Sequence, residues 1–571
     1  MSPISPSLDS LRSLEGYYRV PIKRELYADF ITPICALRAL KAHSQETFLL
    51  ESIEDSKRWG RYSFLGLHPS AEIKISAWQV MISSSDPRLL ALHTLSNNHA
   101  SVQHSKTSSG KACVRFQAEP KRVLREILRL YKSPKLPDMP PFTGGLVGYF
   151  AYDSIAYAEP VLDFPRTNPP TQADFGADCK RDSALAPESS PHANKSSSIS
   201  SGWEPDSSDD MHLMLFEHVV VFDHFTQKLL LITNLDFTHL ESSYARGVEK
   251  LELIANILQN ASHNPSAKHF HAQDSAPKSL QAFAPFALKG AFQRYFDEKR
   301  FCEIVRKAKH YITQGDIFQV VLSNPIQARA EGSLLNVYRV LRTSNPSPYM
   351  FYLSSADLEI TGSSPETLVR LEDSTLYTYP LAGSRPRGAD EQEDKALEYE
   401  LLGDEKELSE HNMLVDLARN DMGKVARIGS VEVAAYKQIV RYSHIMHIAS
   451  TIRAELDSGQ DALSALEAIL PAGTLSGAPK IRACEIIHEL EETPHAGRRG
   501  IYGGAIGYMD FSGNMDTCIA IRLVYKRGDR VFVRSGAGIV HDSDERAEWR
   551  ELENKAKAIL RALEIASAGL E

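Results

Sequence analysis

The sequence predicts a mixed α/β fold, and three observations support this class. Residues 17–80 alternate short apolar runs with turn signals, which is typical of strands. Two further apolar runs, MHLMLFEHVVVFDH and KLLLITNL, predict a pair of neighbouring strands. The C-terminal half carries long amphipathic segments of helical periodicity, such as ELSEHNMLVDLARND at 407–421.

The composition describes an ordinary globular protein. The chain has 571 residues, a length that predicts roughly three to four domain-sized units. Apolar residues make up 43% and charged residues 24%, and the net charge of −9 comes without a basic run, which argues against nucleic acid binding. No apolar run approaches the ~20 residues that a membrane helix needs. The first residues, MSPISPSLDSLRSLEGYYRV, lack the apolar core of a signal or transit peptide.

The six cysteines are widely separated and form no CxxC pair. This spacing argues against a zinc site and against a disulfide framework. It favours a reducing compartment, and we therefore expect a cytoplasmic location.

The pattern along the chain predicts two main regions. A tail at 1–16 precedes an N-terminal region at 17–260, in which helices are predicted near Phe30–Ala42, Lys121–Lys132 and 238–260. Residues 174–211 are rich in Ser, Asp, Pro and Ala without periodicity, and they predict a disordered insertion between sheet elements. A polar linker at 261–292 then leads into a C-terminal region at 293–571.

Two predicted helices each begin with a Glu-x-x-Glu pair on their apolar side. Glu407 and Glu410 share a face with the apolar residues of 407–421, and Glu548, Glu551 and Lys555 continue the stripe of EWRELENKAKAILRALEIA. Because a buried carboxylate is costly unless it is compensated, one cation shared by all four glutamates is a consistent interpretation. Oxygen ligands favour a hard ion such as Mg²⁺. The alternative is that these glutamates lie on solvated helix faces.

Three short motifs predict catalytic groups or close backbone approach. GDIFQVVLS leads into a strand that carries Gln319, which alone is typical of a hydrogen-bonded core residue. Glu366 follows the Ser-Ser-Pro turn of TGSSPETLV. If its surroundings raise its pKa, this carboxyl group can act as a general acid, whereas a solvated carboxylate cannot. Gly383 and Ser384, in YPLAGSRPRG, permit close approach of a ligand to the backbone.

Three further motifs predict anion binding. AGTLSGAPK leads into a helix with Pro479 in its first turn and Ser476 or Gly477 as its cap, so that free amides would point at an anion. AIRLVYK supplies a strand arginine, Arg522. A nest of amides for a carboxylate is predicted at Gly536, Ala537 and Gly538. Each signal is weak alone, and together they predict a small polyanionic substrate beside a metal.

The motifs GSSPE, PLAGSRPRG, DEKELSEHNMLVDLARND, AGTLSGAPK, YGGAIGY and SGAGIV follow one another over roughly residues 296–565. Their combination resembles the chorismate-utilising enzymes, and within them the large, component I subunits of anthranilate synthase. LLES, RYSFLG and GGLVGYFAYD resemble the N-terminal region of that family. The resemblance implies two large antiparallel sheets packed as a sandwich with helices outside, and a chorismate-binding catalytic region at 293–571.

The resemblance also implies roles for residues that match the family's motifs. Glu410 and Glu551 correspond to Mg²⁺ ligands, and Glu407 and Glu548 would support the ion through water. Glu366 corresponds to the general acid that helps the C4 hydroxyl of chorismate to leave. The residues implied to hold chorismate and its carboxylates are Gly383, Ser384, Tyr502, Arg522, Gly536, Ala537 and Gly538.

His447, in RYSHIMH, corresponds to a histidine that takes the C2 proton, although a core histidine is the alternative from the residues alone. Thr474 would line the pocket, and Ser384 stands where the family usually has threonine. Relatives that make isochorismate resemble this chain but carry a lysine base in place of Gln319. Aminodeoxychorismate synthases have a lysine nucleophile in place of Ala382. The absence of both lysines favours conversion of chorismate and ammonia to anthranilate and pyruvate, the first step of tryptophan biosynthesis.

The alternative to an enzyme is a catalytically silent subunit that senses tryptophan. Such a subunit would have lost one of the metal-binding glutamates, Glu366 or Arg522. All of these residues are present. The chain has no Gly-Cys-Gly-type nucleophile turn, so ammonia is expected from a separate glutamine amidotransferase subunit, component II. The resemblance implies a heterodimer or a heterotetramer.

LLES and NPSPYMFY resemble the family's feedback site for L-tryptophan. Glu51 and Ser52 would meet the polar end of tryptophan, and Pro348, Tyr349 and Met350 would form a wall of the site. From the residues alone, NPSP is a rigid turn and LLES is the end of a strand. Binding of tryptophan would bias a two-state closure around the distant chorismate site.

Overall fold

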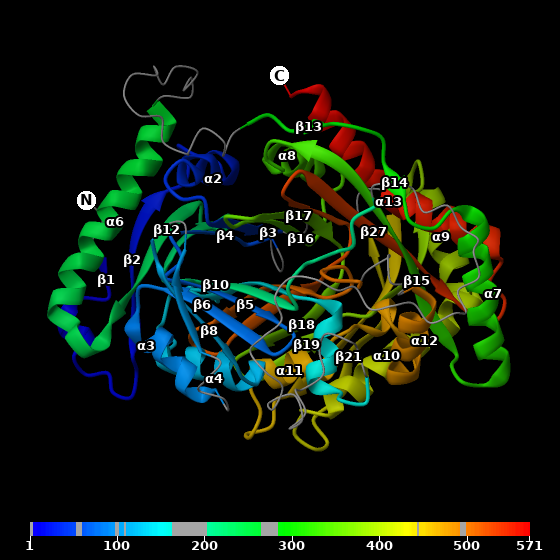
Figure 1. Ribbon diagram of the computed structural model, residues 1–571, viewed down its shortest axis with the longest axis horizontal. Helices are drawn as coiled ribbons and strands as arrows, with labels where there is room; N and C mark the ends of the chain where they lie inside the picture. Colours follow the sequence, from blue (N-terminus) through cyan, green and yellow to red (C-terminus); the bar gives the residue numbers. More distant parts are fainter. Residues whose placement is uncertain are drawn as a thin grey trace, which may run out of the picture.

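Two large antiparallel sheets packed face to face form the centre of the computed structural model, which describes residues 4–52, 60–96, 102–107, 110–162, 203–263, 284–441, 445–491 and 498–570 (Figure 1). Sheet 1 runs in the order β1 (Ile4–Ser5), β2 (Arg19–Tyr27), β12 (Lys228–Asp236), β11 (His218–Asp223), β4 (Tyr62–Leu67), β3 (Thr47–Glu51), β16 (Tyr349–Ser354), β17 (Leu358–Ser364), β26 (Leu523–Arg527), β27 (Arg530–Ile539), β15 (Gln319–Glu331) and β13 (Ala287–Leu288). Strands β14 (Gln293–Arg294) and β23 (Gly477–Ala478) also pair with β15.

Sheet 2 runs in the order β20 (Leu381–Pro386), β22 (Ile445–Glu455), β19 (Thr375–Thr378), β18 (Thr367–Glu372), β25 (Met515–Ile519), β24 (Ala505–Asp510), β9 (Gly145–Phe150), β10 (Met211–Phe216), β5 (Ala71–Ser76), β6 (Gln79–Ser84), β8 (Ala112–Gln117) and β7 (Gln103–Lys106), and β21 (Glu432–Arg441) pairs with β22. Both sheets take strands from both halves of the chain, since β3 pairs with β16 and β24 pairs with β9. The predicted N-terminal and C-terminal regions therefore share their sheets.

Helices cover the outer faces of the sandwich. The outer face of sheet 1 packs against α2 (Pro33–Lys41), α6 (Leu240–His263), α8 (Leu335–Ser344) and α13 (Glu545–Ala568). In Figure 1, α2 and α8 lie at the top, α6 runs along the left side and α13 lies at the upper right. The outer face of sheet 2 packs against α4 (Pro120–Leu130), α10 (Glu405–Gly423) and α11 (Ala462–Ile469). Helices α7 (Glu298–Gln314) and α12 (Lys480–Glu491) pack against β15 at one end. The shorter or more peripheral helices are α1 (Leu8–Leu11), α3 (Pro87–Leu90), α5 (Ile155–Ala158) and α9 (Glu391–Gly403).

Strand alternation explains why three apolar layers form. On β3, Phe48 points into the space between the sheets, whereas its neighbour Leu49 points toward the helices above sheet 1. Phe48 meets Phe216 of β10 edge to face, with ring centroids 4.7 Å apart. The aromatic layer between the sheets thus fixes their separation, and the α/β class with two antiparallel sheets and outer helices is confirmed.

Most predicted elements are confirmed, and two sequence expectations differ from the structure. Residues 174–202 of the expected disordered insertion lie outside the described residues, but 203–210 do not form a loose loop. The Asp206 carboxylate accepts a hydrogen bond from Tyr525 at 2.6 Å, and Glu204 pairs with Arg530 at 2.8 Å. Residue 211 already opens β10. The 1–16 segment assigned to a tail contains β1, which pairs with β2, and α1, whose last residue is buried.

In the described part of the chain, no helix is long and apolar enough to cross a membrane. The five cysteines that fall within it carry free thiols: Cys35, Cys113, Cys302, Cys484 and Cys518.

Candidate active site

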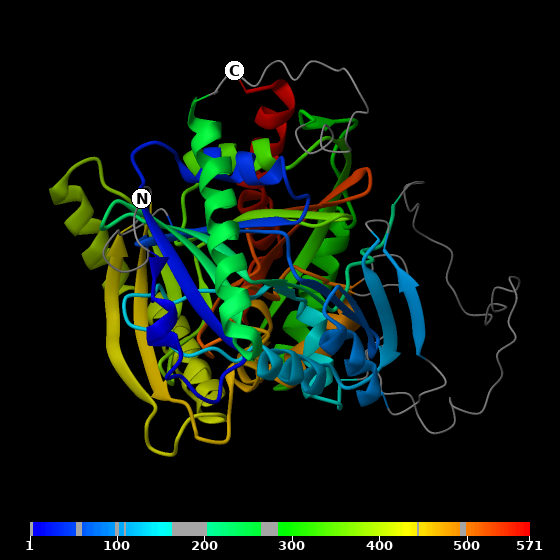
Figure 2. The same cartoon turned by 90° about the vertical axis from the view of Figure 1, so that its left-hand side faces the viewer.

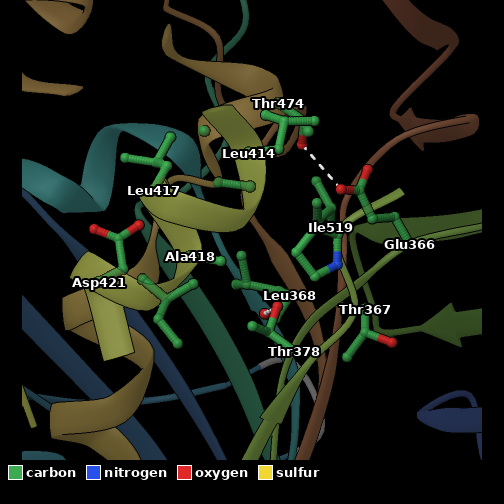
Figure 3. Close-up of a pocket in the computed structure, with 14 residues that line it drawn as sticks. Glu366, Thr367, Leu368, Thr378, Leu414, Leu417, Ala418, Asp421, Thr474 and Ile519 are labelled. Atoms are coloured by element: carbon green, nitrogen blue, oxygen red, sulfur yellow. Dashed lines mark hydrogen bonds between the residues drawn. The ribbon is translucent and has the colours of Figure 1, made fainter. Parts of the chain in front are cut away.

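Glu366 lies in the turn between β17 and β18, and it lines a cavity (Figure 3). The Thr474 hydroxyl donates to Oε1 of Glu366 at 3.2 Å. Burial raises the pKa of Glu366 to about 7, against the weaker lowering effects of Thr474, Arg522 and Lys555. A carboxyl group with such a pKa holds its proton near neutral pH, as a general acid must.

The rest of this cavity is largely apolar. Helix α10 contributes one wall, and Figure 3 shows Leu414 and Ala418 projecting from it toward Ile519 and Leu368. Leu417 lines the pocket on another side, next to Gly473. These side chains keep water away from one side of the Glu366 carboxyl group. The raised pKa thus follows from the packing of α10 against sheet 2.

A bulge in β20 brings Gly383 beside two predicted site residues. The register of β20 against β22 shifts between Ala382 and Ser384, and Gly383 adopts a φ of +66°. A Cβ atom at this position would lie 3.1 Å from Oε2 of Glu407, so glycine permits the close approach. Ser384 stands opposite His447 in the ladder, and Nδ1 of His447 lies 3.0 Å from the Gly383 carbonyl oxygen. Burial lowers the pKa of His447.

Gln319 and the residues of SGAGIV face each other across β15 and β27. Gln319 is buried, and its Nε2 atom lies 2.9 Å from where a Cβ of residue 538 would be. Residues 536–538 are not the predicted nest, because they form an extended part of β27 paired with β15. Beyond Val533 the other edge of β27 has no partner among the described strands. Tyr502 lies beside this edge, with its hydroxyl 2.7 Å from the Cβ position of residue 536.

Arg522 is not the strand residue that we expected. It lies in the connection between β25 and β26 with a φ of +49°, a left-handed conformation that is uncommon for a residue other than glycine. Its carbonyl accepts a hydrogen bond from the Ser363 amide at 3.0 Å, which holds the turn. The guanidinium is close enough to lower the pKa of both Glu366 and His447. Such conformations occur at functional sites, where the surroundings maintain the strain.

The four predicted metal glutamates begin α10 and α13. Burial raises the pKa of Glu407, Glu410 and Glu548, and in each case the charge of Glu551 raises it further. Four oxygen-donor side chains fit a hard divalent cation by their chemistry. Among the described residues, no group of three or more His, Cys, Asp or Glu side chains is already arranged to hold a metal.

The apolar stripe of α13 does not include Glu551 and Lys555, contrary to our expectation. Both side chains are about half exposed, and Lys555 contacts Glu551 at 2.7 Å. Leu552 and Ala556 are buried on either side of Lys555, so the stripe stays in the core while Glu551 and Lys555 lie beside it. Lys555 donates to the Gly536 carbonyl at 3.1 Å and lowers the pKa of Glu366. The structure thereby adds a cation that the sequence analysis did not assign to the site.

The predicted helix cap at Ser476 or Gly477 is wrong. Gly477 belongs to β23, which pairs with Gln319 and Val320, and the Ser476 hydroxyl donates back to the Ala472 carbonyl. The helix α12 begins only at Lys480, after the proline. Thr474 lies just before β23, in the 3₁₀ helix η7 (Gly473–Leu475), which places its hydroxyl beside Glu366.

The five predicted tryptophan-site residues gather around a second cavity. The cavity has an aromatic lining, and its walls include Glu51, Ser52, Tyr62, Phe64, Pro348, Tyr349, Met350, Phe351, Tyr508 and Asp516. Burial raises the pKa of Asp516, which accepts from the Tyr349 hydroxyl at 2.8 Å. Sequence analysis missed Asp516, whose only signal is an acidic residue within the strand run MDTCI.

Glu51 is already bonded within the protein. Its carboxylate accepts from Arg342 at 2.6 Å and also from Tyr338. The expected contact of Glu51 with the polar end of a ligand would have to compete with Arg342.

Comparison with known proteins identifies what this architecture is similar to. Residues 187–561 match the family described as chorismate binding enzyme. The anthranilate synthase component 1 of Aquifex aeolicus is 39% identical, with 99% of each chain covered. That of Acinetobacter calcoaceticus is 38% identical, with 97% of each chain covered.

Solved structures of related proteins are also similar to this chain. The component I of anthranilate synthase from Streptococcus pneumoniae superposes with a TM-score of 0.64 at 30% identity, covering 94% of this chain and 99% of that one. The menaquinone-specific isochorismate synthase of Escherichia coli superposes with a TM-score of 0.58 at 18% identity, covering 97% of this chain and 98% of that one. At this identity the likeness shows a shared fold.

Proposed function

Since the chain belongs to the chorismate-binding enzymes, and within them to the anthranilate synthase component 1 proteins, we propose that its site converts chorismate and ammonia to anthranilate and pyruvate. The observation that carries the chemistry is the Glu366 carboxyl group, with its pKa near 7 and its contact with Thr474. A protonated acid at this place suits the departure of a hydroxyl group. Chorismate is a dianion, and Arg522 and Lys555 supply positive charge beside that acid.

Two residues would move the protons. Glu366 donates its proton to the leaving C4 hydroxyl while ammonia adds at C2. His447 then takes the C2 proton as pyruvate is lost and the ring becomes aromatic. The Gly383 carbonyl near Nδ1 favours the tautomer in which Nδ1 carries the proton, so that Nε2 bears the basic lone pair. The lowered pKa of His447 keeps the imidazole neutral and able to accept a proton.

We propose Mg²⁺ as the cofactor. Glu410 and Glu551 would hold the ion, with Glu407 and Glu548 acting through water. When bound, it would neutralise a substrate carboxylate and stabilise the charge that develops during departure of the hydroxyl. The raised pKa values of Glu407, Glu410 and Glu548 support the proposal, because burial and the nearby charge of Glu551 both disfavour their ionised forms and a cation would stabilise them.

The name component 1 implies a partner subunit, and we propose that this partner is a glutamine amidotransferase that supplies ammonia. The function is tested without it, using purified chain, chorismate, Mg²⁺ and an ammonium salt at alkaline pH. We expect anthranilate and pyruvate, identified by fluorescence and mass, and no product after EDTA treatment. Isochorismate, or an amino intermediate that keeps its pyruvyl group, would show that Gln319 or Ala382 has been misinterpreted. No turnover, even with the partner, would favour a silent subunit.

We further propose that the second cavity binds L-tryptophan and inhibits the enzyme. Ser52→Phe would fill the space beside Met350, so we expect the tryptophan concentration for half-inhibition to rise by about ten-fold or more. Activity without tryptophan should stay at the wild-type level, because the cavity is separate from Glu366. Ser242→Phe, at an exposed position of α6, is the matched control. Unchanged inhibition of the Ser52 variant would contradict the assignment.

A further inference from the structure

Arg499 lies in the connection between α12 and β24, and its side chain has no exposed surface. Its Nε and Nη2 atoms donate to Glu491, the last residue of α12, at 2.9 and 2.6 Å. Two further hydrogen bonds reach backbone carbonyls, from Nη1 to Leu475 and from Nη2 to Val321, both at 2.5 Å. The ring centroid of Tyr152 lies 4.6 Å from the central carbon of the guanidinium. One guanidinium group thus joins α12, β15 and η7.

The bond to Leu475 bears on the proposed general acid. Leu475 is the last residue of η7 and directly follows Thr474, whose hydroxyl donates to Oε1 of Glu366 at 3.2 Å. Two hydrogen bonds join η7 to other elements of the described chain, one from Arg499 and one between Thr474 and Glu366. At the start of the turn, the Leu475 amide donates to the Ala472 carbonyl at 3.0 Å. The guanidinium therefore holds the turn that carries the partner of Glu366.

The contact between Thr474 and Glu366 depends closely on the position of η7. Hydrogen bonds between two oxygen atoms usually span about 2.5–3.0 Å, so a contact of 3.2 Å is already long. A displacement of η7 by about half an ångström away from Glu366 would break it. A guanidinium group is planar, and its donors stand at fixed angles to one another. It therefore fixes the separation between the Leu475 and Val321 carbonyls more strictly than a flexible ammonium group does.

We infer that Arg499 is a positioning residue for Glu366: its guanidinium fixes η7 against β15 and thereby holds the Thr474 hydroxyl beside the carboxyl group of the acid. The inference rests on the proposed function, in which Glu366 protonates the leaving hydroxyl of chorismate. The hydrogen bond from Thr474 lowers the pKa of Glu366, against the larger effect of burial. Loss of this hydrogen bond would therefore raise that pKa further.

The other charged groups that face Glu366 lie on elements to which this guanidinium is not hydrogen-bonded. Arg522, in the connection between β25 and β26, and Lys555 of α13 both lower the pKa of Glu366. Asp421 of α10 lines the same cavity and forms an ion pair with a buried lysine. A variant at Arg499 leaves these groups unchanged, so a change in the pH dependence of activity reports the contact with Thr474.

The test is Arg499→Lys in the full-length chain, assayed with chorismate, Mg²⁺ and an ammonium salt at constant unprotonated ammonia. Lysine keeps a positive charge beside Glu491 but lacks the planar fork that reaches both carbonyls. We expect the fall of kcat/KM with rising pH to move to higher pH, by about as much as in Thr474→Val, which removes the hydroxyl itself. The double variant should behave as Thr474→Val does alone, because the group that Arg499 positions is then absent.

Amide hydrogen exchange of the peptide that covers residues 472–478 is a readout that needs no turnover. Exchange should be about ten-fold faster in Arg499→Lys, because η7 has lost a charge-assisted hydrogen bond. Arg498→Lys is the matched control. The neighbouring Arg498 pairs with Asp153 and Asp210, and within the described part of the chain it donates no hydrogen bond to η7. Its variant should keep the wild-type pH dependence and the wild-type exchange rate of this peptide.

Three outcomes would overturn the inference: an unshifted pH dependence in Arg499→Lys, an additional shift in the double variant, or unchanged exchange of residues 472–478. If Arg499→Lys does not fold, Glu491→Gln takes its place, since it keeps the size of residue 491 and replaces one of the two oxygens that hold the guanidinium by an amide group. The pH dependence should then shift in the same direction, and no shift would again overturn the inference. Turnover of chorismate by the wild type tests the proposed function separately, because the exchange measurement reports on η7 whether or not the chain turns over.

Discussion

Replacing Glu366 by glutamine is expected to lower ammonia-dependent kcat by about 10²–10⁴-fold, the usual loss when a general acid is removed. Glutamine has almost the same shape and still accepts the Thr474 hydrogen bond, but it has no acidic proton for the leaving hydroxyl. Chorismate binding should therefore change little. Steady-state kinetics with saturating ammonia measure both quantities.

The pH dependence of the wild type supplies a second readout. The folded-state pKa of Glu366 is raised from 4.5 to about 7, so the acid loses its proton, and kcat/KM falls, as pH rises through about 7 at constant unprotonated ammonia. The same shift means that the stability contributed by the protonated form at low pH is lost as pH rises toward 7. Glu366→Gln removes this dependence, and its melting temperature at pH 8 should equal or exceed that of wild type.

A stable variant that retained most of its activity would assign the acid to another residue. The most informative control is Thr474→Val, which keeps the acid and removes the hydroxyl that lowers its pKa. The fall of kcat/KM with rising pH should therefore occur at a higher pH than in wild type. The loss of kcat should be smaller than in Glu366→Gln.

Periodicity predicted those parts of the site that lie on regular elements. The helix at 407–421 falls within α10, with Glu407 and Glu410 partly buried on the predicted side. The sequence pattern also predicted a glycine that permits close approach at Gly383, since glycine adopts its positive φ without strain and leaves room for Glu407. Such features depend on local spacing, which a single sequence displays directly.

Features that depend on long-range pairing could not be predicted in the same way. Residues 536–538 resemble a nest in sequence, but pairing with β15 extends them into a strand. Arg522 has the neighbours of a strand residue, yet the connection between two sheets imposes a left-handed conformation on it. Lys555 was assigned to the apolar stripe by its spacing, but its side chain is about half exposed and pairs with Glu551, while Leu552 and Ala556 fill the core. In each case tertiary contacts outweigh the local pattern.

The motif AGTLSGAPK ends in a lysine whose importance only the structure reveals. Lys480 donates to Asp421 of α10 at 2.7 Å and to the Ile469 carbonyl at 2.8 Å, and both charged side chains are under 10% exposed. The pair ties the helix that carries Glu407 and Glu410 to the segment that carries Thr474. Asp421 also lines the cavity beside Glu366 (Figure 3). Figure 2 shows α10 at the foot of the molecule, away from α6 in the foreground.

Lys480→Met is expected to destabilise the protein by about 3–5 kcal/mol, because it leaves Asp421 buried with only the partly exposed Lys424 at 3.3 Å as a partner. Urea unfolding measures this loss. The double variant Asp421→Asn/Lys480→Met removes both charges, so its loss should be well below the sum of the single losses. Lys395→Met, which breaks the exposed pair with Glu391 on α9, is the matched control and should cost under about 1 kcal/mol. Additive losses at 421 and 480 would mean that the two charges do not stabilise each other, and that α10 is held in place by its apolar face alone.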